Sequence, residues 1–511
     1  MIGHLFGQKA AVYNKFPRPA RFDRNIVVIG AGSAGLVSSL IGASVKASVT
    51  LVESHKMGGD CLNYGCVPSK ALIKTAKLLH MARQSSKYGI KRMDAEVDFA
   101  QAMDRVADIV KKIEPHDSVE RYTGFGVDVV LGRATIKTPW SVEIALNDEN
   151  GQPTGATQLL TTRNIIIATG AEPLVPPIPG LDEMGVLTSD NIWELRELPR
   201  RLLVLGGGPI GCELAQSFQR LGSQVTQVEM VSALMSREDP DISSMVMNQF
   251  TREGVDIRVN HKAIRFENRG DTKVLIAERT DNNGELVEIE FDAVLCALGR
   301  KARLNGYGLD DLGIKISKRR TVEVNDFLQT NYPNIYAAGD IAGPYQFTHT
   351  ASHMAWFASV NALFGRFWRF KVDYRVIPWA TFTEPEVARV GLNETEAKEK
   401  GIPYEVVSYG IDDLDRAIAD GVDYGVVKVL TVPGKDKILG VTIAGEHAGD
   451  LIAEFVTAMK YNLGLKKIMG TIHIYPTLVE SNKYAAGEWQ KAHIPEKLLS
   501  YVRRLHDWER S

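Results

Sequence analysis

Residues 25–35 read Asn-Ile-Val-Val-Ile-Gly-Ala-Gly-Ser-Ala-Gly, and the fold of the chain can be worked out from this segment. The apolar first half is typical of a buried parallel strand. The glycines that follow have the spacing G-x-G-x-x-G and are Gly30, Gly32 and Gly35. This spacing permits a tight turn, a close approach of the backbone to a pyrophosphate, and close packing of the next helix on the strand. A second strand at 48–52 leads into Glu53, whose carboxylate can accept hydrogen bonds from a ribose.

The same element occurs a second time, and two copies are much stronger evidence than one. The second copy consists of predicted strands at 201–205 and 224–228 and of Gly206, Gly208, Gly211 and Glu229. In each copy the acidic residue lies 23 positions after the first glycine. We therefore predict an α/β protein with two dinucleotide sites. A carboxylate at Glu229 favours the free 2′-hydroxyl of NAD over the 2′-phosphate of NADP, with NADP as the alternative because Arg237 lies downstream.

Composition narrows the class of protein further. A length of 511 residues predicts three or four domains. The net charge of −2 gives no support to a nucleic-acid binder, which needs a basic excess. Four cysteines are too few for a secreted disulfide scaffold or a multi-cysteine zinc site. Residues 26–45 carry no charge over a length that could span a membrane, but their glycines and serines favour a strand, loop and helix, so we expect a cytoplasmic protein without a membrane span.

Two of the four cysteines, Cys61 and Cys66, lie five positions apart. In a regular helix this separation places the Cα atoms about 8.6 Å apart, whereas a disulfide needs roughly 4.4–6.8 Å. The helix must therefore be interrupted, and Gly65 can adopt the unusual dihedral angles that an interruption needs. A pair that closes so short a loop stabilises little, so it is better interpreted as redox-active or metal-binding. Because no further ligands cluster nearby and a glycine loop precedes the pair, electron transfer is favoured.

Residues 58–70 read Gly-Gly-Asp-Cys-Leu-Asn-Tyr-Gly-Cys-Val-Pro-Ser-Lys and resemble the active-site motif of the class I pyridine nucleotide-disulfide oxidoreductases. This family includes dihydrolipoamide dehydrogenase, glutathione reductase and mercuric reductase. The resemblance extends over about residues 25–490 and includes motifs at 168–170, 335–340 and 382–386. It implies an enzyme with an FAD domain, an NAD(P) domain, a central domain and a C-terminal interface domain, assembled as a homodimer.

The predicted fold is α/β, with two Rossmann-like dinucleotide-binding domains and an α+β C-terminal dimerisation domain. Proline-rich and turn-rich stretches indicate where its parts meet. The predicted parts are an N-terminal extension at 1–24, the first part of the FAD-binding domain at 25–172, the NAD(P)-binding domain at 173–298, a central part that completes the FAD-binding domain at 299–377, and the dimerisation domain at 378–511.

The resemblance also implies roles for individual residues. Cys66 would be the thiolate next to the flavin, and Cys61 would be the interchange thiol that faces the substrate. Lys70 would lie near the flavin and pair with Glu213, because a buried cation needs a partner carboxylate. Asp340 would bind the ribityl chain of FAD. The other cofactor-binding residues would be Glu53, Gly59, Thr169, Gly170, Gly299 and Gly339, together with the glycines of the two loops and Glu229.

The C-terminal motif departs from the family pattern. Disulfide reductases of the family have His-Pro-Thr-x-x-Glu, in which the histidine is the acid/base for the interchange thiol across the dimer. Here Tyr475 occupies the histidine position, and Glu480 matches the glutamate. Tyrosine, with an ordinary pKa of about 10, is a poor base at neutral pH, so His473 is the alternative acid/base, unless it is simply a packed histidine. A second departure is Asp60, where many relatives have threonine and where a carboxylate would tend to raise the pKa of Cys61.

These features predict an FAD-dependent oxidoreductase that takes electrons from NAD(P)H and passes them through a Cys61–Cys66 disulfide. The acceptor would be a small molecule, either a disulfide, a metal ion or a quinone-like oxidant. Tyr475 resembles the tyrosine of mercuric reductases, but the chain ends without the vicinal cysteine pair that relays Hg(II) in those enzymes. Dihydrolipoamide dehydrogenase activity is the alternative, and a flavin-based redox sensor is the non-enzyme alternative.

Overall fold

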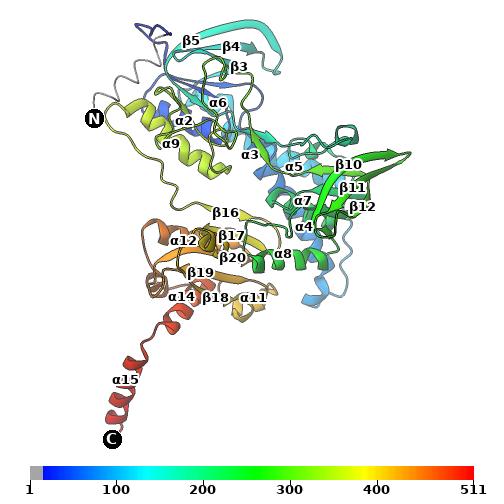
Figure 1. The fold of residues 1–511 in the computed structure, drawn as a ribbon, viewed down its shortest axis with the longest axis vertical. Coiled ribbons are helices and arrows are strands. Elements are labelled where there is room, and N and C mark those ends of the chain that lie inside the picture. Colours follow the sequence, from blue (N-terminus) through cyan, green and yellow to red (C-terminus); the bar gives the residue numbers. More distant parts are fainter. Residues whose placement is uncertain (1–14) are drawn as a thin grey trace. The chain divides into compact units, whose positions relative to one another are not determined.

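The computed structural model describes residues 15–511 (Figure 1). Residues 1–14 of the predicted N-terminal extension lie outside the described part. The chain divides into two compact units, each made of two segments. The first unit runs up to Arg200 and resumes over Ala293–Val372, and the second comprises Arg201–Asp292 and Asp373–Ser511.

The first unit is built on a sheet with a buried central strand. Its parallel strands, in spatial order, are β2 (Val49–Glu53), β1 (Arg24–Ile29), β5 (Pro153–Ile167) and β15 (Ile335–Ala337). Ile26, Val27 and Val28 of β1 are fully buried, as a strand covered on both faces requires. Strand β3 (Asp128–Thr138) starts in parallel with β2 and then pairs with β4 (Ser141–Asn147), which returns antiparallel to β5.

Helices and a short ribbon complete the first unit (Figure 1). The helices are α2 (Ser33–Ser44), α3 (Gly59–Asn63), α4 (Cys66–Arg83), α5 (Phe99–Ile113), α6 (Val119–Gly124) and α9 (Thr348–Phe364). Helix α2 packs closely on α9 because small residues face each other, and the Ser359 hydroxyl donates a hydrogen bond to the Ser38 carbonyl at 3.2 Å. Strands β6 (Ala171–Pro173) and β14 (Arg300–Ala302) form an antiparallel ribbon, and β13 (Ala293–Cys296) precedes β14.

The second unit begins with the second nucleotide-binding motif. Its parallel strands are β7 (Arg201–Leu205), β8 (Gln224–Val228) and β9 (Asp256–Arg258), and its helices are α7 (Pro209–Leu221) and α8 (Pro240–Arg252). An antiparallel sheet of β10 (His261–Arg269), β11 (Thr272–Arg279) and β12 (Leu286–Phe291) follows. Both strand, glycine loop and helix motifs predicted from the sequence are therefore present, one in each unit.

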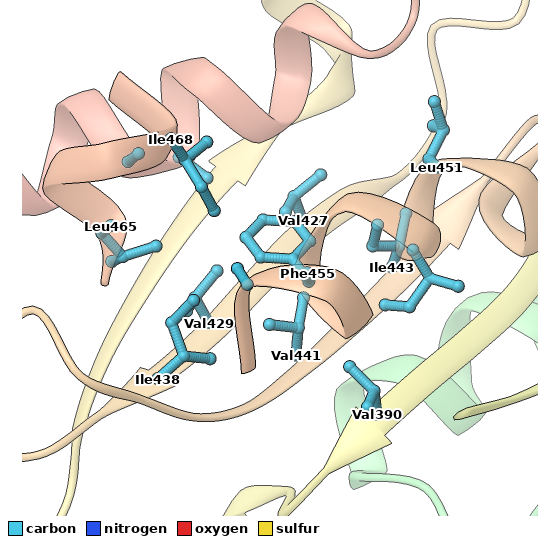
Figure 2. Close-up of a cluster of buried hydrophobic side chains, with 14 of the residues drawn as sticks. Val390, Val427, Val429, Ile438, Val441, Ile443, Leu451, Phe455, Leu465 and Ile468 are labelled. Carbon is cyan, nitrogen blue, oxygen red and sulfur yellow. The ribbon is translucent and has the colours of Figure 1, made fainter. Parts of the chain in front are cut away.

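The C-terminal part of the second unit is an antiparallel sheet covered by helices. The strands, in spatial order, are β16 (Pro378–Thr381), β17 (Glu386–Gly391), β20 (Ile438–Gly445), β19 (Val426–Thr431) and β18 (Glu405–Gly410). The helices are α10 (Glu394–Glu399), α11 (Asp415–Asp420), α12 (Ala448–Lys460), α13 (Leu465–Met469), α14 (Glu480–Ala492) and α15 (Glu496–Glu509). Figure 2 shows Phe455 of α12 among valine and isoleucine side chains of β19 and β20, which form the core of this part.

Buried ion pairs join the two halves of the second unit. The Arg389 side chain, only 2% exposed, lies 3.2 Å from Glu238 and 2.8 Å from Glu396, and its guanidinium lies over the Trp379 ring. Lys428 is similarly buried and contacts acidic residues from both halves. Because an isolated buried charge is costly, these pairs favour one arrangement of the two halves within the unit.

The structure shows whether any described segment could span a membrane. The uncharged stretch at 26–45 is strand β1, a glycine loop and α2, so it is part of the folded core. No helix within residues 15–511 is both long and apolar enough to cross a membrane.

Helix α15, at the C-terminal end, does not contribute to the core of the second unit, because none of its residues is buried.

Candidate active site

The first glycine loop closes tightly at the end of β1. A Cβ atom at Gly30 would lie 2.5 Å from the Ala168 carbonyl oxygen, and one at Gly35 would lie 1.7 Å from the Gly30 carbonyl oxygen. Both distances are far below van der Waals contact, so only glycine fits at these positions. The Glu53 carboxylate, at the end of β2, accepts a hydrogen bond from the Ala31 amide at 2.6 Å. The predicted loop and its acidic residue are thus brought together.

The second glycine loop repeats this geometry. A Cβ atom at Gly211 would lie 2.2 Å from the Gly206 carbonyl oxygen, and the Glu229 carboxylate accepts a hydrogen bond from the Gly207 amide at 2.6 Å. Gly208 differs, because a Cβ atom there would meet nothing within 4 Å. The space in front of Gly208 is therefore free for the diphosphate of a dinucleotide, which is the role of the second glycine in this motif.

A Gly208→Ala substitution is expected to leave the fold intact and to weaken nicotinamide dinucleotide binding. The backbone at this position, with φ −77° and ψ 178°, suits alanine, and the added methyl group meets open space. A bound diphosphate would meet that methyl group, so we expect the KM for the dinucleotide to rise by about tenfold or more. Steady-state kinetics and thermal unfolding measure the two effects. An unchanged KM would show that the dinucleotide does not approach the loop at this glycine.

The two cysteines lie on a turn that packs directly against the first glycine loop. Cys61 is in α3 and Cys66 begins α4, and Gly65 between them has φ −118° and ψ −105°, so the predicted interruption of the helix is present. Gly59 begins α3 in the left-handed region with φ +59°, where a Cβ atom would lie 2.6 Å from the Gly32 Cα atom. The cysteine turn and the loop predicted to hold FAD are therefore in backbone contact.

Both cysteines are free thiols, and their surroundings differ. Cys61 is partly buried, and its contact with the Cys66 thiol, followed by burial, raises its pKa. Cys66 is exposed and lies with its Sγ atom 3.5 Å from the hydroxyl of Thr348, the first residue of α9. The arrangement can form a disulfide between two adjacent thiols and release an electron pair, or reverse that step. The other two cysteines, Cys212 and Cys296, are buried.

Asp60, next to Cys61, forms an ion pair with Arg300 at the start of β14. Arg303 lies 3.8 Å from the other carboxylate oxygen. The carboxylate that the sequence predicts to disturb Cys61 is therefore neutralised by a partner, and the largest contributions to the raised pKa of Cys61 come from Cys66 and from burial.

The residues predicted to hold FAD fit that group. Burial raises the pKa of Asp340 to about 6, and no hydrogen bond to its carboxylate is present among residues 15–511. A largely buried carboxylate without a donor is suited to accept hydrogen bonds from the hydroxyl groups of a ribityl chain. A Cβ atom at Gly339 would lie 3.2 Å from the Ala34 Cβ atom, so Asp340 follows a close approach to the start of α2. Gly170 and Gly299 both face open space.

The remaining predicted cofactor residues are spread over both units. Thr169 shares a 3.0 Å hydrogen bond with the Tyr307 hydroxyl. Lys70, on α4 of the first unit, donates a hydrogen bond to the Ser69 hydroxyl at 3.3 Å. Glu213, on α7 of the second unit, is 7% exposed and accepts a hydrogen bond from the Phe382 amide. Because Lys70 and Glu213 belong to different units, their pairing stays a prediction.

The C-terminal motif places a tyrosine, not a base, at the surface. Tyr475 is 64% exposed, and its hydroxyl donates a hydrogen bond to Asp415 at 2.9 Å, which raises the pKa of the tyrosine. The His473 side chain is 5% exposed, and its Nε2 atom lies 2.9 Å from Glu454, an arrangement typical of a packed histidine. Glu480, at the start of α14, is buried, and its carboxylate accepts a hydrogen bond from the Thr477 amide.

Two residues at the cysteine turn, Thr348 and Arg300, are not among those predicted from the sequence. Thr348 is 282 positions from Cys66, and Arg300 is 240 positions from Asp60. No short-range spacing could reveal such contacts. The one signal for Arg300 in the sequence is its place at the end of the Ala-Leu-Gly-Arg segment at 297–300, which indicates a domain boundary.

Comparison with known families covers both parts of the chain. Residues 24–355 match the model of a family described as pyridine nucleotide-disulphide oxidoreductase. Residues 377–486 match the dimerisation domain of the same family. Together the two matches extend from the first strand to α14.

Individual proteins of known name are similar over nearly their whole length. A mercuric reductase of Streptomyces lividans is 34% identical over 90% of this chain and 95% of its own length. A dihydrolipoyl dehydrogenase of Chlamydia muridarum is 33% identical over 89% of this chain and 94% of its own length. The Cu(II) complex of the HOCl-induced flavoprotein disulfide reductase RclA from Escherichia coli superposes with a TM-score of 0.78, at 27% identity, over 91% of this chain and 99% of that one.

Proposed function

Because the chain belongs to the pyridine nucleotide-disulphide oxidoreductase family and is therefore an FAD-dependent oxidoreductase, we propose that it transfers electrons from NADH through Cys61 and Cys66 to a thiophilic metal ion. Its electron donor would be NADH because the Glu229 carboxylate, held by the Gly207 amide, accepts a ribose 2′-hydroxyl and repels a 2′-phosphate. A higher kcat/KM with NADPH than with NADH would contradict this assignment of the donor.

The cysteine pair carries the electrons between the cofactor and the acceptor. When bound, FAD would supply two-electron transfer between the nicotinamide and the cysteine pair. Cys66 begins α4 with its Sγ atom 3.5 Å from the Thr348 hydroxyl, and Cys61 would be the thiol that meets the acceptor, as the family resemblance implies. When the two thiols return to the disulfide, two electrons leave for the acceptor and two protons are released to the solvent. The electrons reduce one Hg(II) ion to the metal, or two Cu(II) ions to Cu(I), with no proton delivered to the metal.

Tyr475 is the observation that favours a metal ion over a lipoamide. Oxidising dihydrolipoamide requires a base that takes a proton from a substrate thiol, and reducing a disulfide requires protons for two product thiols. The Tyr475 hydroxyl donates a hydrogen bond to Asp415, and its raised pKa keeps it protonated at neutral pH, so it cannot act as that base. Reduction of a metal ion needs no such group. The names of the mercuric reductase and of the Cu(II) complex of RclA support the same class of acceptor.

A homodimer is part of this proposal. The match to a dimerisation domain at 377–486 supports it. The segment before α14 also supports it, since Ile472 and Ile474 are 94% and 76% exposed in the single chain. Large exposed apolar side chains that flank a motif predicted to act across a dimer are suited to be covered by a partner subunit. Sedimentation that gives only a monomer would contradict the dimer.

An acceptor screen tests the proposal. Purified flavoprotein would be assayed under anaerobic conditions with NADH and with Hg(II), Cu(II), lipoamide, glutathione disulfide or a quinone. We expect the highest kcat/KM with a metal ion. Turnover that is fastest with lipoamide would favour the dihydrolipoamide dehydrogenase alternative. If NADH does not bleach the flavin at all, the proposal that the protein is an NADH-dependent enzyme is wrong.

A Tyr475→His substitution is expected to raise activity with lipoamide by about tenfold or more, because histidine supplies the missing base. Activity with the metal ion should change much less, since that reaction moves no proton at this position. The matched control is Tyr475→Phe, which removes the hydroxyl without adding a base and should leave lipoamide activity low. Equal effects of histidine and phenylalanine would show that position 475 does not handle the substrate proton.

A further inference from the structure

The turn that carries the two cysteines is held by a connected set of hydrogen bonds in the first unit. Arg300 binds the Asp60 carboxylate and also donates to the Ala171 carbonyl at 2.9 Å, which ties the turn to the β6–β14 ribbon. A second guanidinium nitrogen of Arg300 lies 3.5 Å from the Ser189 hydroxyl. The Trp193 indole donates to the carbonyl oxygens of both Ser189 and Tyr64. Both ends of the cysteine turn are therefore anchored through the same neighbouring segment.

The charges around this anchor are nearly balanced. Asp60 is the carboxylate adjacent to Cys61, and the Arg300 side chain that binds it is 15% exposed, so solvent screens the pair only in part. The charged or titratable groups that share these surroundings are Cys66, Tyr64, Asp190, Arg303 and Asp340. Removing Asp60 would leave Arg300 without this carboxylate, and removing Arg300 would leave Asp60 with only Arg303, 3.8 Å away, so the net charge beside the thiol would change in opposite directions in the two cases.

We propose that Arg300 is a positioning residue that holds Asp60 and cancels most of its charge beside Cys61. The inference rests on the proposed function only in taking Cys61 as the thiol that meets the acceptor. With the charge of Asp60 cancelled, a carboxylate can lie next to the reactive thiol without repelling an anionic reaction partner. The Asp60–Arg300 pair would therefore influence whether Cys61 reacts more readily with anionic, neutral or cationic partners.

The ratio of two alkylation rates tests the local charge directly. The flavoprotein, reduced with a phosphine, would be alkylated at about pH 8 with neutral iodoacetamide or anionic iodoacetate. Tandem mass spectrometry would assign the modification to Cys61. Dividing the iodoacetate rate by the iodoacetamide rate removes the effects of thiolate fraction and general access, which are common to both reagents. The ratio therefore reports the electrostatic potential at Cys61, which a purely structural role of Arg300 would not change.

Opposite shifts are expected in the two single variants. In R300Q, Asp60 keeps only the more distant Arg303, and its excess negative charge should lower the ratio by about threefold or more. In D60N, Arg300 loses this carboxylate, and its excess positive charge should raise the ratio by a similar factor. The double variant should return to the wild-type ratio. The matched control is K301Q, which removes the neighbouring cation of β14 from its exposed pair with Glu172 and should leave the ratio unchanged.

The result that would overturn the proposal is an unchanged ratio in D60N, or shifts of the same sign in both single variants. If R300Q does not fold, D60N alone decides, because it retains the cation and removes only the carboxylate charge. The assay uses neither NADH nor an electron acceptor. If the acceptor screen fails but the alkylation ratios shift as expected, the proposed function is wrong. The proposed role of Arg300 is then still supported.

Discussion

Replacing Cys61 with alanine is expected to lower turnover with the physiological acceptor by about 10³-fold or more, while NADH still reduces the flavin. The contact between Cys61 and Cys66 is the only route to a disulfide at this turn, because the other cysteines of the chain are buried elsewhere. Without Cys61 the electron pair cannot leave through a thiol exchange. Transfer to small artificial dyes, which can take electrons without the dithiol, should survive.

The measurement combines anaerobic titration with NADH, which reports flavin bleaching, and steady-state turnover with each acceptor. Cys296→Ala is the matched control, since the Cys296 thiol is buried against the Leu174 carbonyl and has no part in the proposed transfer. Full acceptor turnover in the Cys61 variant would show that electrons bypass the dithiol and would exclude the route proposed for this enzyme.

A Gly35→Ala substitution is expected to abolish FAD binding and to destabilise the first unit. The added Cβ atom would lie 1.7 Å from the Gly30 carbonyl oxygen, and this backbone atom cannot move without opening the loop between β1 and α2. Overpacking of a well-packed site costs roughly 1–3 kcal/mol even where side chains can adjust. Here the clash is with backbone, so we expect a colourless protein with a lower Tm.

The flavin content of the purified protein and its thermal unfolding measure these effects. Gly124→Ala is the matched control, because a Cβ atom at Gly124, on α6, would meet nothing within 4 Å. The control should bind FAD fully and unfold at the wild-type temperature. A Gly35 variant that retains its flavin would show that the loop is wider in solution than the close approach of Gly30 and Gly35 indicates.

The fold and the two nucleotide sites could be predicted from the sequence because their signals are local. A glycine is required at Gly35 by an atom only five residues away, and Glu53 binds the loop at the end of the next strand. The interruption at Gly65 is equally local, since helix geometry alone forbids a short Cys61–Cys66 contact without it. Such constraints operate over one turn or one βαβ unit, so they can be recognised from the spacing of residues in the sequence.

The electrostatic character of the site was decided by the tertiary structure. The partner of Asp60 is Arg300, 240 positions away, and the partner of Tyr475 is Asp415, 60 positions away. The local sequence therefore predicts that Asp60 disturbs Cys61, and it leaves the acid/base open between Tyr475 and His473. Charge interactions depend on distance in space and on burial, which only the packing of separate segments sets. The conformations of the loops are determined by the local sequence, whereas the tertiary structure determines which charges are paired.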